Sequence, residues 1–288
     1  MPEAFVFKPV KGYWFTFFTI DELKRSSGCI ETTLDLGLST RVVCVENNRL
    51  LLSKGIEVDV RELEPSEHDR VVLLEETGRI YEVVLHTETG FYKLKATGKT
   101  TAPTLEINGI HMHRIQDTDP WRDTISKIRA ARVTSGLNIL DTCMGLGYTA
   151  IASLRRGASS IYTFEIDENV VWITERNPWS RELSSDRIRI NIMDVVEGIF
   201  SLESEYFHRV IHDPPRFTRS TGSLYSLDFY KELYRVLRHG GILFHYTGEP
   251  RRHGAPSILK GIKNRLMEAG FTNVYYDAEA QGFIGFKR

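Results

Sequence analysis

The hydrophobic pattern of the chain changes near residue 110. Before that point, short runs of β-branched and aromatic residues alternate with turn residues such as Asn47-Asn48, Thr77-Gly78 and Thr89-Gly90. This alternation is typical of short antiparallel strands, which we expect at 40–46, 49–53, 70–76, 79–86 and 91–97. A short helix is expected near 21–25, and the charged stretch 61–70 is expected to be a solvated loop. The pattern predicts a small β-rich domain over residues 1–110.

After residue 137, apolar runs of strand length alternate with longer runs of helical period. The predicted strands are 138–141, 160–167, 187–194, 208–213 and 241–248, and the predicted helices are 148–156, 168–176, 195–202, 226–238 and 256–269. Five strand–helix units favour a doubly wound, mostly parallel sheet. The last two runs, 272–280 and 282–288, are too close together for a crossover, so we expect an antiparallel hairpin that completes seven strands. Residues 111–288 are therefore predicted to form an α/β domain.

The segment between the two patterns is rich in polar side chains. Asp119 followed by Pro120 is a typical N-cap and first-turn pair, so a helix is expected to begin there. His111 and His113 would share one face of a strand, which is compatible with a metal ion. A third ligand is lacking in the sequence, so we predict a pair at a strand end and no metal site.

Composition and charge narrow the function classes. The net charge is −1, and the residues up to Arg114 carry 14 basic against 17 acidic side chains, so the β-rich part lacks the basic character of a nucleic-acid-binding appendage. No apolar run reaches membrane-spanning length, and the N-terminus lacks a signal-peptide pattern. The three cysteines lack metal-ligand spacing and are expected to be reduced thiols, which points to a cytoplasmic protein without membrane association.

A glycine turn follows the first strand of the α/β part. The sequence there is NILDTCMGLGYT, in which Asp141 ends the strand and Gly145 and Gly147 precede a helix. Glycines allow close approach of the backbone to a ligand, and a helix N-terminus offers free N–H groups. A strand, a glycine turn and a helix in this order predict a nucleotide-type ligand.

Two further acids end the second and third strands. Glu165 lies 24 residues after Asp141, where a carboxylate can accept hydrogen bonds from both ribose hydroxyls. Asp194 ends the third strand, where it could accept a hydrogen bond from an adenine amino group. Each acid alone could equally be a helix cap, and a nicotinamide-binding turn is the alternative for the whole set. The G-x-G-x-x-G spacing of that alternative is absent, and the C-terminal hairpin argues against it.

These motifs, DTCMGLG, FEID, IMD and HDPPR, resemble those of class I S-adenosylmethionine-dependent methyltransferases over roughly residues 121–288. More narrowly, the chain resembles the predicted archaeal methyltransferases with a spermidine-synthase-like catalytic domain. The resemblance implies that Asp141, Gly145 and Gly147 hold the methionine part of S-adenosylmethionine. It also implies that Glu165 holds the ribose, that Ile166 packs on adenine and that Asp194 binds the adenine edge. Cys143 stands where the family has its first glycine.

The fourth strand ends in HDPPRF, next to the expected sulfonium site. The two prolines remove N–H donors and stiffen the turn, so Asp213 and the carbonyl of Pro214 would both accept hydrogen bonds from a planar amine. Asp213, Pro214, Pro215 and Arg216 resemble the Asp/Asn-Pro-Pro-aromatic motif of amino-group methyltransferases, with Arg216 in the aromatic position. Arginine could stack on a flat substrate or pair with its phosphate or carboxylate. The alternative is a rigid turn with a capping aspartate.

The sequence therefore predicts an S-adenosylmethionine-dependent methyltransferase that acts on a nitrogen, with an RNA base or a small-molecule amine as substrate. An aminopropyltransferase using decarboxylated S-adenosylmethionine is the second hypothesis, although the Asp-x-x-Asp expected of that family reads Asp213-Pro214-Pro215-Arg216. A non-catalytic binding subunit with the same fold is the third.

Overall fold

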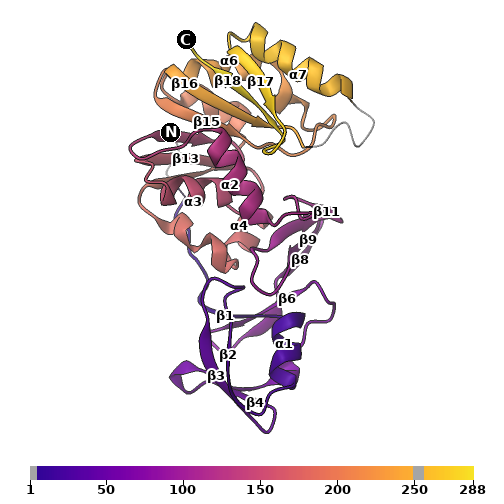
Figure 1. Ribbon diagram of the computed structural model, residues 1–288. Helices are drawn as coiled ribbons and strands as arrows, with labels where there is room; N and C mark the ends of the chain where they lie inside the picture. Colours follow the sequence, from indigo (N-terminus) through magenta and orange to yellow (C-terminus); the bar gives the residue numbers. More distant parts are fainter. Residues whose placement is uncertain (1–4, 249–255) are drawn as a thin grey trace. The chain divides into compact units, whose positions relative to one another are not determined.

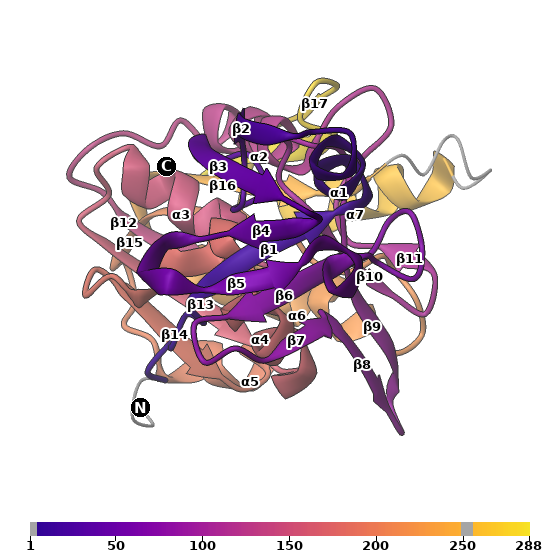
Figure 2. The ribbon, with the colours of Figure 1, turned by 90° about the horizontal axis from the view of Figure 1, so that it is seen from below.

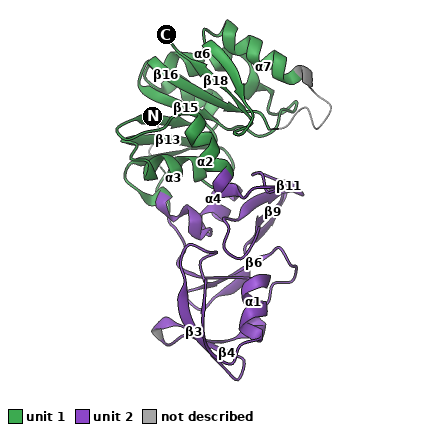
Figure 3. Cartoon of the chain, viewed as in Figure 1, with its two compact units in different colours: residues 1–7, 123–168, 183–288 green, residues 8–122, 169–182 purple. Residues whose placement is uncertain are grey.

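The computed structural model describes residues 5–248 and 256–288. Two compact units divide the chain, as Figure 3 shows: unit 1 comprises Met1–Phe7, Asp123–Glu168 and Leu183–Arg288, and unit 2 comprises Lys8–Arg122 and Asn169–Glu182. The boundary between residues 122 and 123 falls inside helix α2, Pro120–Ala130. Unit 2 therefore includes the predicted polar junction and a later segment of the chain, as well as the N-terminal strands.

Unit 1 is built on one sheet of seven strands (Figure 1). In spatial order the strands are β14 (Ile188–Ile192), β13 (Ser160–Glu165), β12 (Asn138–Asp141), β15 (Phe207–His212), β16 (Leu237–Tyr246), β18 (Gly282–Phe286) and β17 (Thr272–Asp277). The first five run parallel, and β18 is antiparallel to both β16 and β17. The predicted seven-stranded sheet and its antiparallel C-terminal hairpin are confirmed.

The helices of unit 1 follow the predicted alternation. Besides most of α2 they are α3 (Tyr148–Arg155), α5 (Val195–Gly198), α6 (Leu227–Val236) and α7 (Pro256–Glu268). Most of α4 (Glu168–Glu175) groups with unit 2. The start of α6 is fixed by Ser226, whose hydroxyl oxygen accepts a hydrogen bond from the Phe229 N–H at 3.1 Å.

Strand β16 begins at Leu237, four residues before the predicted start. Leu237 pairs with Phe207, whereas Ile242 pairs with Arg209, so β16 carries extra residues opposite a short stretch of β15. A bulge of this kind allows a strand to include glycines that would otherwise end it. Gly240, with φ of 73°, is the left-handed position in this bulge.

Unit 2 contains three small antiparallel sheets. Their strands are β1 (Gly12–Thr16), β6 (Val71–Glu75) and β7 (Ile80–Glu82); β2 (Gly28–Thr32), β3 (Arg41–Glu46), β4 (Arg49–Leu51) and β5 (Glu57–Asp59); and β8 (Val84–Thr87), β9 (Gly90–Lys95), β10 (Thr104–Ile107) and β11 (Ile110–His111). Figure 2 shows β8 and β9 as a hairpin. Helix α1 spans Phe17–Lys24 and begins earlier than predicted. The β-rich character predicted for this part of the chain is confirmed.

The predicted strand 79–86 is in fact two strands of different sheets. The chain bends at Val83, between β7 and β8, and this side chain is fully buried. Its N–H donates to the Val71 carbonyl at 2.8 Å, and its carbonyl accepts from the Leu94 N–H at 3.0 Å. The backbone of Val83 therefore bonds to both sheets. The hydrophobic pattern of residues 79–86 is the same for one continuous strand as for two strands that meet at Val83.

Two of the three cysteines form a disulfide, Cys29–Cys44, so the expectation of three reduced thiols is wrong for this pair. The antiparallel register of β2 and β3 places Cys29 directly opposite Cys44. Cys143 remains a free thiol. The cysteine count therefore no longer supports a reducing compartment. Among the described residues, no helix is long and apolar enough to cross a membrane.

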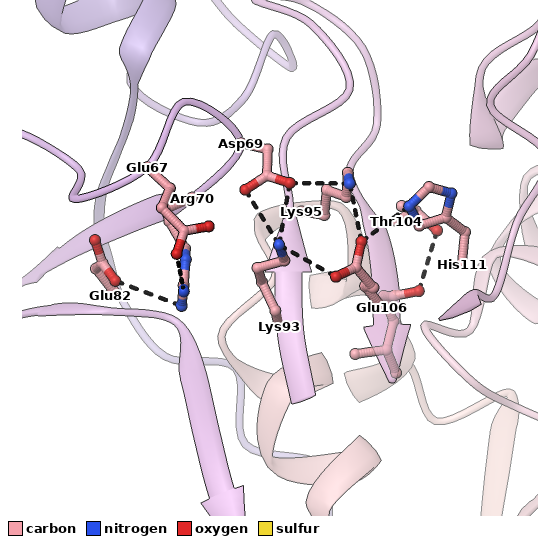
Figure 4. A network of polar contacts seen from close by, with 10 residues as sticks. Glu67, Asp69, Arg70, Glu82, Lys93, Lys95, Thr104, Glu106 and His111 are labelled. Carbon is pink, nitrogen blue, oxygen red and sulfur yellow. Dashed lines mark hydrogen bonds and ion pairs between the residues drawn. The ribbon is translucent and has the colours of Figure 1, made fainter. Parts of the chain in front are cut away.

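A charged network in unit 2 overturns part of the predicted solvated loop at 61–70 (Figure 4). Asp69 Oδ2 lies 3.0 Å from Lys93 Nζ and 2.9 Å from Lys95 Nζ. Glu106 pairs with the same two lysines at 3.2 and 2.8 Å, and His111 Nε2 lies 2.9 Å from its Oε2. Arg70, at the end of the loop, pairs with Glu67 at 2.8 Å. The end of the loop is thus tied to β9, whose two lysines also pair with Glu106 of β10.

We expect Glu106→Gln to lower the free energy of unfolding by about 2 kcal/mol at neutral pH, because Lys93 and Lys95 each lose one of two carboxylate partners and keep Asp69. Burial raises the pKa of Glu106, but the ion pairs with Lys95 and Lys93 outweigh this and bring the pKa below its ordinary value. Such a carboxyl takes up a proton on unfolding, so its contribution is present above the unfolded pKa and is lost as pH falls through the folded pKa. The difference between the variant and wild type should therefore shrink in acid.

Urea unfolding at neutral and acidic pH measures this difference. Glu88→Gln, at an exposed site before β9, is the matched control and should be close to wild type at both pH values. A constant difference at all pH values would contradict the assigned ion pairs.

Candidate functional site

The centre of the unit 1 sheet brings the predicted motifs together. β12 pairs in parallel with β13 on one side and with β15 on the other, so the strand order reverses at β12. In open α/β sheets, ligands bind beyond the carboxyl ends of the strands at such a switch point. Asp141 ends β12, and Asp213 directly follows β15. The glycine turn and the HDPPR segment therefore lie at the same sheet edge.

The glycine turn requires glycine at Gly147 for two reasons. Its φ is 74°, in the left-handed region, where it forms the N-cap of α3. A Cβ at this position would also lie 2.5 Å from Leu183 Cδ1. Gly145 is left-handed as well, with φ of 53°. The turn closes through the Gly147 N–H, which donates to the Met144 carbonyl at 2.7 Å.

Asp141 is fully buried beneath this turn. Its carboxylate accepts hydrogen bonds from the Thr149 hydroxyl at 3.0 Å and the Thr163 hydroxyl at 2.7 Å. Burial raises its pKa to about 7, although the two threonines act in the opposite direction. Asp141 thus connects β12, β13 and α3. Its effect on a ligand would be indirect, because it holds the glycine turn in position.

Glu165 reaches from the end of β13 to the glycine turn. One carboxylate oxygen accepts from the Gly145 N–H, and the other accepts from the N–H groups of Ile166 and Asp167, all at 3.0 Å. Burial raises its pKa, and the three backbone hydrogen bonds partly oppose this. Ile166 is 67% exposed, which leaves an apolar side chain available to a ligand beside Glu165.

The remaining predicted cofactor residues differ in their surroundings. Asp194 is the N-cap of α5, and its Oδ1 accepts from the Val196 N–H at 2.8 Å. The cap alternative thus holds for this side chain, while contact with adenine stays a prediction. Cys143 is the one partly exposed residue of the fully described stretch 141–150. Its surroundings raise the pKa of the thiol by burial, so the thiol is protonated at neutral pH.

His212, the buried last residue of β15, is hydrogen-bonded through both ring nitrogens. Its Nε2 lies 3.0 Å from the Leu224 carbonyl oxygen, which can only accept, so Nε2 carries the proton. Nδ1 then accepts from the Thr142 hydroxyl at 2.7 Å. Burial lowers the pKa of His212 to about 3, which keeps the ring neutral. This histidine links the residue after Asp141 to the loop that follows the proline pair.

The DPPR residues divide between the interior and the surface. Asp213 is partly buried and Pro214 is buried, whereas Pro215 and Arg216 are exposed. The carbonyl of Pro215 accepts from the Tyr225 hydroxyl at 2.7 Å. Phe217, 49% exposed, packs edge-on against the Tyr225 ring at 5.2 Å between centroids. Tyr225 therefore holds the loop while Arg216 and Phe217 face solvent.

Sequence reasoning missed Lys127, which pairs with Asp213. Its Nζ lies 2.7 Å from Asp213 Oδ2 and 3.0 Å from Asp123 Oδ2. Burial raises the pKa of Asp213, the Lys127 ammonium partly opposes this, and Asp123 adds to the rise. The available signal was the Asp123–Lys127 pair at i, i+4, on the buried face of a helix predicted to lie beside the turn.

The predicted histidine pair lies in unit 2, each member with its own protein partner. His111 bonds to Glu106, and His113 Nδ1 lies 3.1 Å from the Thr104 hydroxyl. Within the part of the chain that the structure describes, no group of three His, Cys, Asp or Glu side chains is arranged to hold a metal ion.

Comparisons with solved structures and known sequences agree with this architecture. Spermidine synthase from Thermotoga maritima superposes with a TM-score of 0.55 and 17% identity, over 74% of this chain and 75% of that one. The chain thus has the Rossmann-like fold of that spermidine synthase. A polyamine aminopropyltransferase from Prochlorococcus marinus (strain MIT 9215) is 24% identical over 67% of each chain.

No protein-family model matches the chain. The uncharacterized protein MJ1233 from Methanocaldococcus jannaschii is 45% identical over 211 residues, which cover 73% of this chain and 71% of that protein. With identity at this level over most of both sequences, the chain belongs to the family of MJ1233.

Proposed function

We propose that the chain is a transferase that binds S-adenosylmethionine and moves its methyl group to a nitrogen atom, with an RNA base as the substrate. The observation that carries the proposal is the place of Asp213. Its carboxylate directly follows β15 at the switch point, beside the glycine turn that ends β12. The fold shared with spermidine synthase supports transfer of a group from an S-adenosylmethionine-type cofactor, and the relatives provide the alternative considered below.

In this proposal the cofactor lies on the glycine turn. Gly145 and Gly147 give the backbone close access to the methionine part, with Asp141 holding the turn from below. Glu165 would bond the ribose hydroxyls, Ile166 would cover the adenine, and Asp194 would meet the adenine edge. Cys143, with its thiol protonated, would line the same site next to the methionine part.

The chemistry that follows needs alignment more than acid–base strength. Bound S-adenosylmethionine would supply an electrophilic methyl group: the substrate nitrogen would form a bond to the methyl carbon as the carbon–sulfur bond breaks with its electrons going to sulfur, and the proton released from nitrogen would pass to the Asp213 carboxylate and on to solvent. Asp213 and the Pro214 carbonyl would accept the two N–H bonds of a planar amine and aim its lone pair at the methyl group. The developing positive charge on nitrogen is stabilised by the same carboxylate.

Exposed side chains after the prolines support a flat, anionic substrate. Phe217 is half exposed and can stack on a base, while Arg216 and Arg219 are exposed cations that can pair with phosphate. This combination of an aromatic ring and guanidinium groups is the chemistry by which unpaired RNA bases are bound.

Aminopropyl transfer is the second candidate, and the similarity to the Prochlorococcus aminopropyltransferase favours it. The reaction would need decarboxylated S-adenosylmethionine and an amine acceptor. Calorimetry with both cofactors separates the candidates: tighter binding of the decarboxylated form supports aminopropyl transfer, and binding of neither supports a non-catalytic subunit. Labelled S-adenosylmethionine, incubated with RNA and small-molecule pools and followed by mass spectrometry, identifies the acceptor.

We expect Asp213→Asn to lower turnover by about 10²–10³-fold, because the variant loses the charge that stabilises the nitrogen in the transition state. S-adenosylmethionine affinity should stay within about threefold of wild type, since Asp213 serves the acceptor rather than the cofactor. Wild-type turnover should itself fall as pH decreases through the raised pKa of Asp213, because a protonated carboxyl is uncharged. Asp228→Asn, exposed on α6, is the control, and full turnover by Asp213→Asn would refute the assigned role.

We expect Glu165→Gln to weaken S-adenosylmethionine binding by about 10–100-fold in calorimetry. A glutamine has one acceptor oxygen, so it cannot accept both from the Gly145 N–H and from the Ile166 and Asp167 N–H groups. Glu168→Gln, exposed three residues later, should bind like wild type. Unchanged affinity in the Glu165 variant would place the ribose elsewhere.

A further inference from the structure

Lys127 occupies a position that is built like a binding site for an alkylammonium ion. Its Nζ lies 2.7 Å from Asp213 Oδ2, 3.0 Å from Asp123 Oδ2 and 3.9 Å from the centroid of the Tyr246 ring. The lysine side chain is 2% exposed and the Asp123 side chain is fully buried. Two carboxylates and an aromatic face are the groups that hold an ammonium ion away from water.

The electrostatics of this cluster keep Lys127 charged. Burial alone would lower its pKa, but the carboxylates of Asp213 and Asp123 outweigh burial and raise the pKa above its ordinary value. A buried ammonium is stable only when it is paired in this way. The chain therefore supplies its own cation to one oxygen of Asp213.

An external cation would meet an unfavourable arrangement here. Asp123 lies behind Lys127 and is closed to solvent, so it offers nothing to an incoming ligand. The accessible carboxylate, Asp213, already shares its charge with Lys127. A second ammonium on Asp213 would lie close to the first, and like charges at that distance repel strongly when water is excluded. An uncharged nitrogen avoids this repulsion and still donates N–H to Asp213 Oδ1.

We propose that Lys127 fills the ammonium position next to Asp213 and thereby restricts the acceptor to a nitrogen that is uncharged at neutral pH. The acceptor class is then an aromatic or amide-type amine, such as the exocyclic amine of a nucleobase, and polyamine cations are rejected. Lys127 is thus a specificity-determining residue. The inference rests on the proposed function for the role of Asp213, but the occupied position itself can be tested without turnover.

The test removes the ammonium group of Lys127 by mutation and then adds a small amine of the same shape to the solution. Lys127→Ala deletes three methylenes and the ammonium, which together have the shape of n-propylammonium. We expect 50 mM n-propylammonium chloride to raise the thermal unfolding midpoint of this variant by about 3 °C and to leave wild type unchanged. The same concentrations of 1-propanol and of potassium chloride should have no such effect on either protein.

Two further variants identify where the added amine binds. In Lys127→Ala combined with Asp213→Asn, the stabilisation by n-propylammonium should be largely lost, because one carboxylate of the position is gone. Lys127→Met fills the space without the charge and should show no stabilisation, and it replaces the alanine variant for spermidine titrations if that variant does not fold. In calorimetry, spermidine should bind the lysine-free protein at least tenfold more tightly than wild type.

The outcomes separate the two proposals. Equal spermidine affinity in wild type and lysine-free protein, or equal effects of n-propylammonium and potassium chloride, would overturn the role of Lys127. Calorimetry of wild type with S-adenosylmethionine is the independent arm: absence of binding would refute the proposed methyl transfer while leaving the amine result intact.

Discussion

The hydrogen bonds of one buried carboxylate hold the proposed cofactor side of unit 1 together. Asp141 accepts from Thr149 at the start of α3 and from Thr163 in β13, so one side chain connects two strands and the helix that follows the glycine turn. A buried carboxylate is costly unless its oxygens are hydrogen-bonded, and the pKa of about 7 reflects that cost. The turn is thus fixed from within the unit, and Glu165 completes it by accepting from the Gly145 N–H.

The proposed acceptor side depends on the same end of β12 through Thr142. Thr142 follows Asp141 and donates to His212, which in turn donates to the Leu224 carbonyl beyond the proline pair. Lys127 adds a second tie, from α2 to Asp213. The loop that carries Asp213 is therefore anchored at its start by a histidine, a threonine and a lysine, and near its end by the hydrogen bond from Tyr225 to Pro215. Both sides are positioned by local contacts of unit 1.

Sequence reasoning succeeded where local physics decides the structure. The glycine turn, the cap of α2 by Asp119 and the C-terminal hairpin are set by residues close together in the chain, and their positions were predictable. It failed where a distant partner decides. Val83 belongs to two sheets, Cys29 meets Cys44 only through the register of β2 and β3, and Lys127 meets a residue 86 positions away. None of these partners leaves a trace in local hydrophobic periodicity.

The fold alone does not distinguish methyl from aminopropyl transfer, because both reactions displace a thioether from a sulfonium centre. What differs is the charge of the acceptor: an aliphatic amine with an ordinary pKa near that of lysine arrives protonated, whereas a base amine arrives neutral. A protein can discriminate between a charged and a neutral acceptor only through the groups that surround the attacking nitrogen. At the proposed acceptor site these groups are a carboxylate and an ammonium from the chain itself. In the proposed function, helix α2, which precedes the first strand of the sheet, is therefore the element through which this chain selects its acceptor.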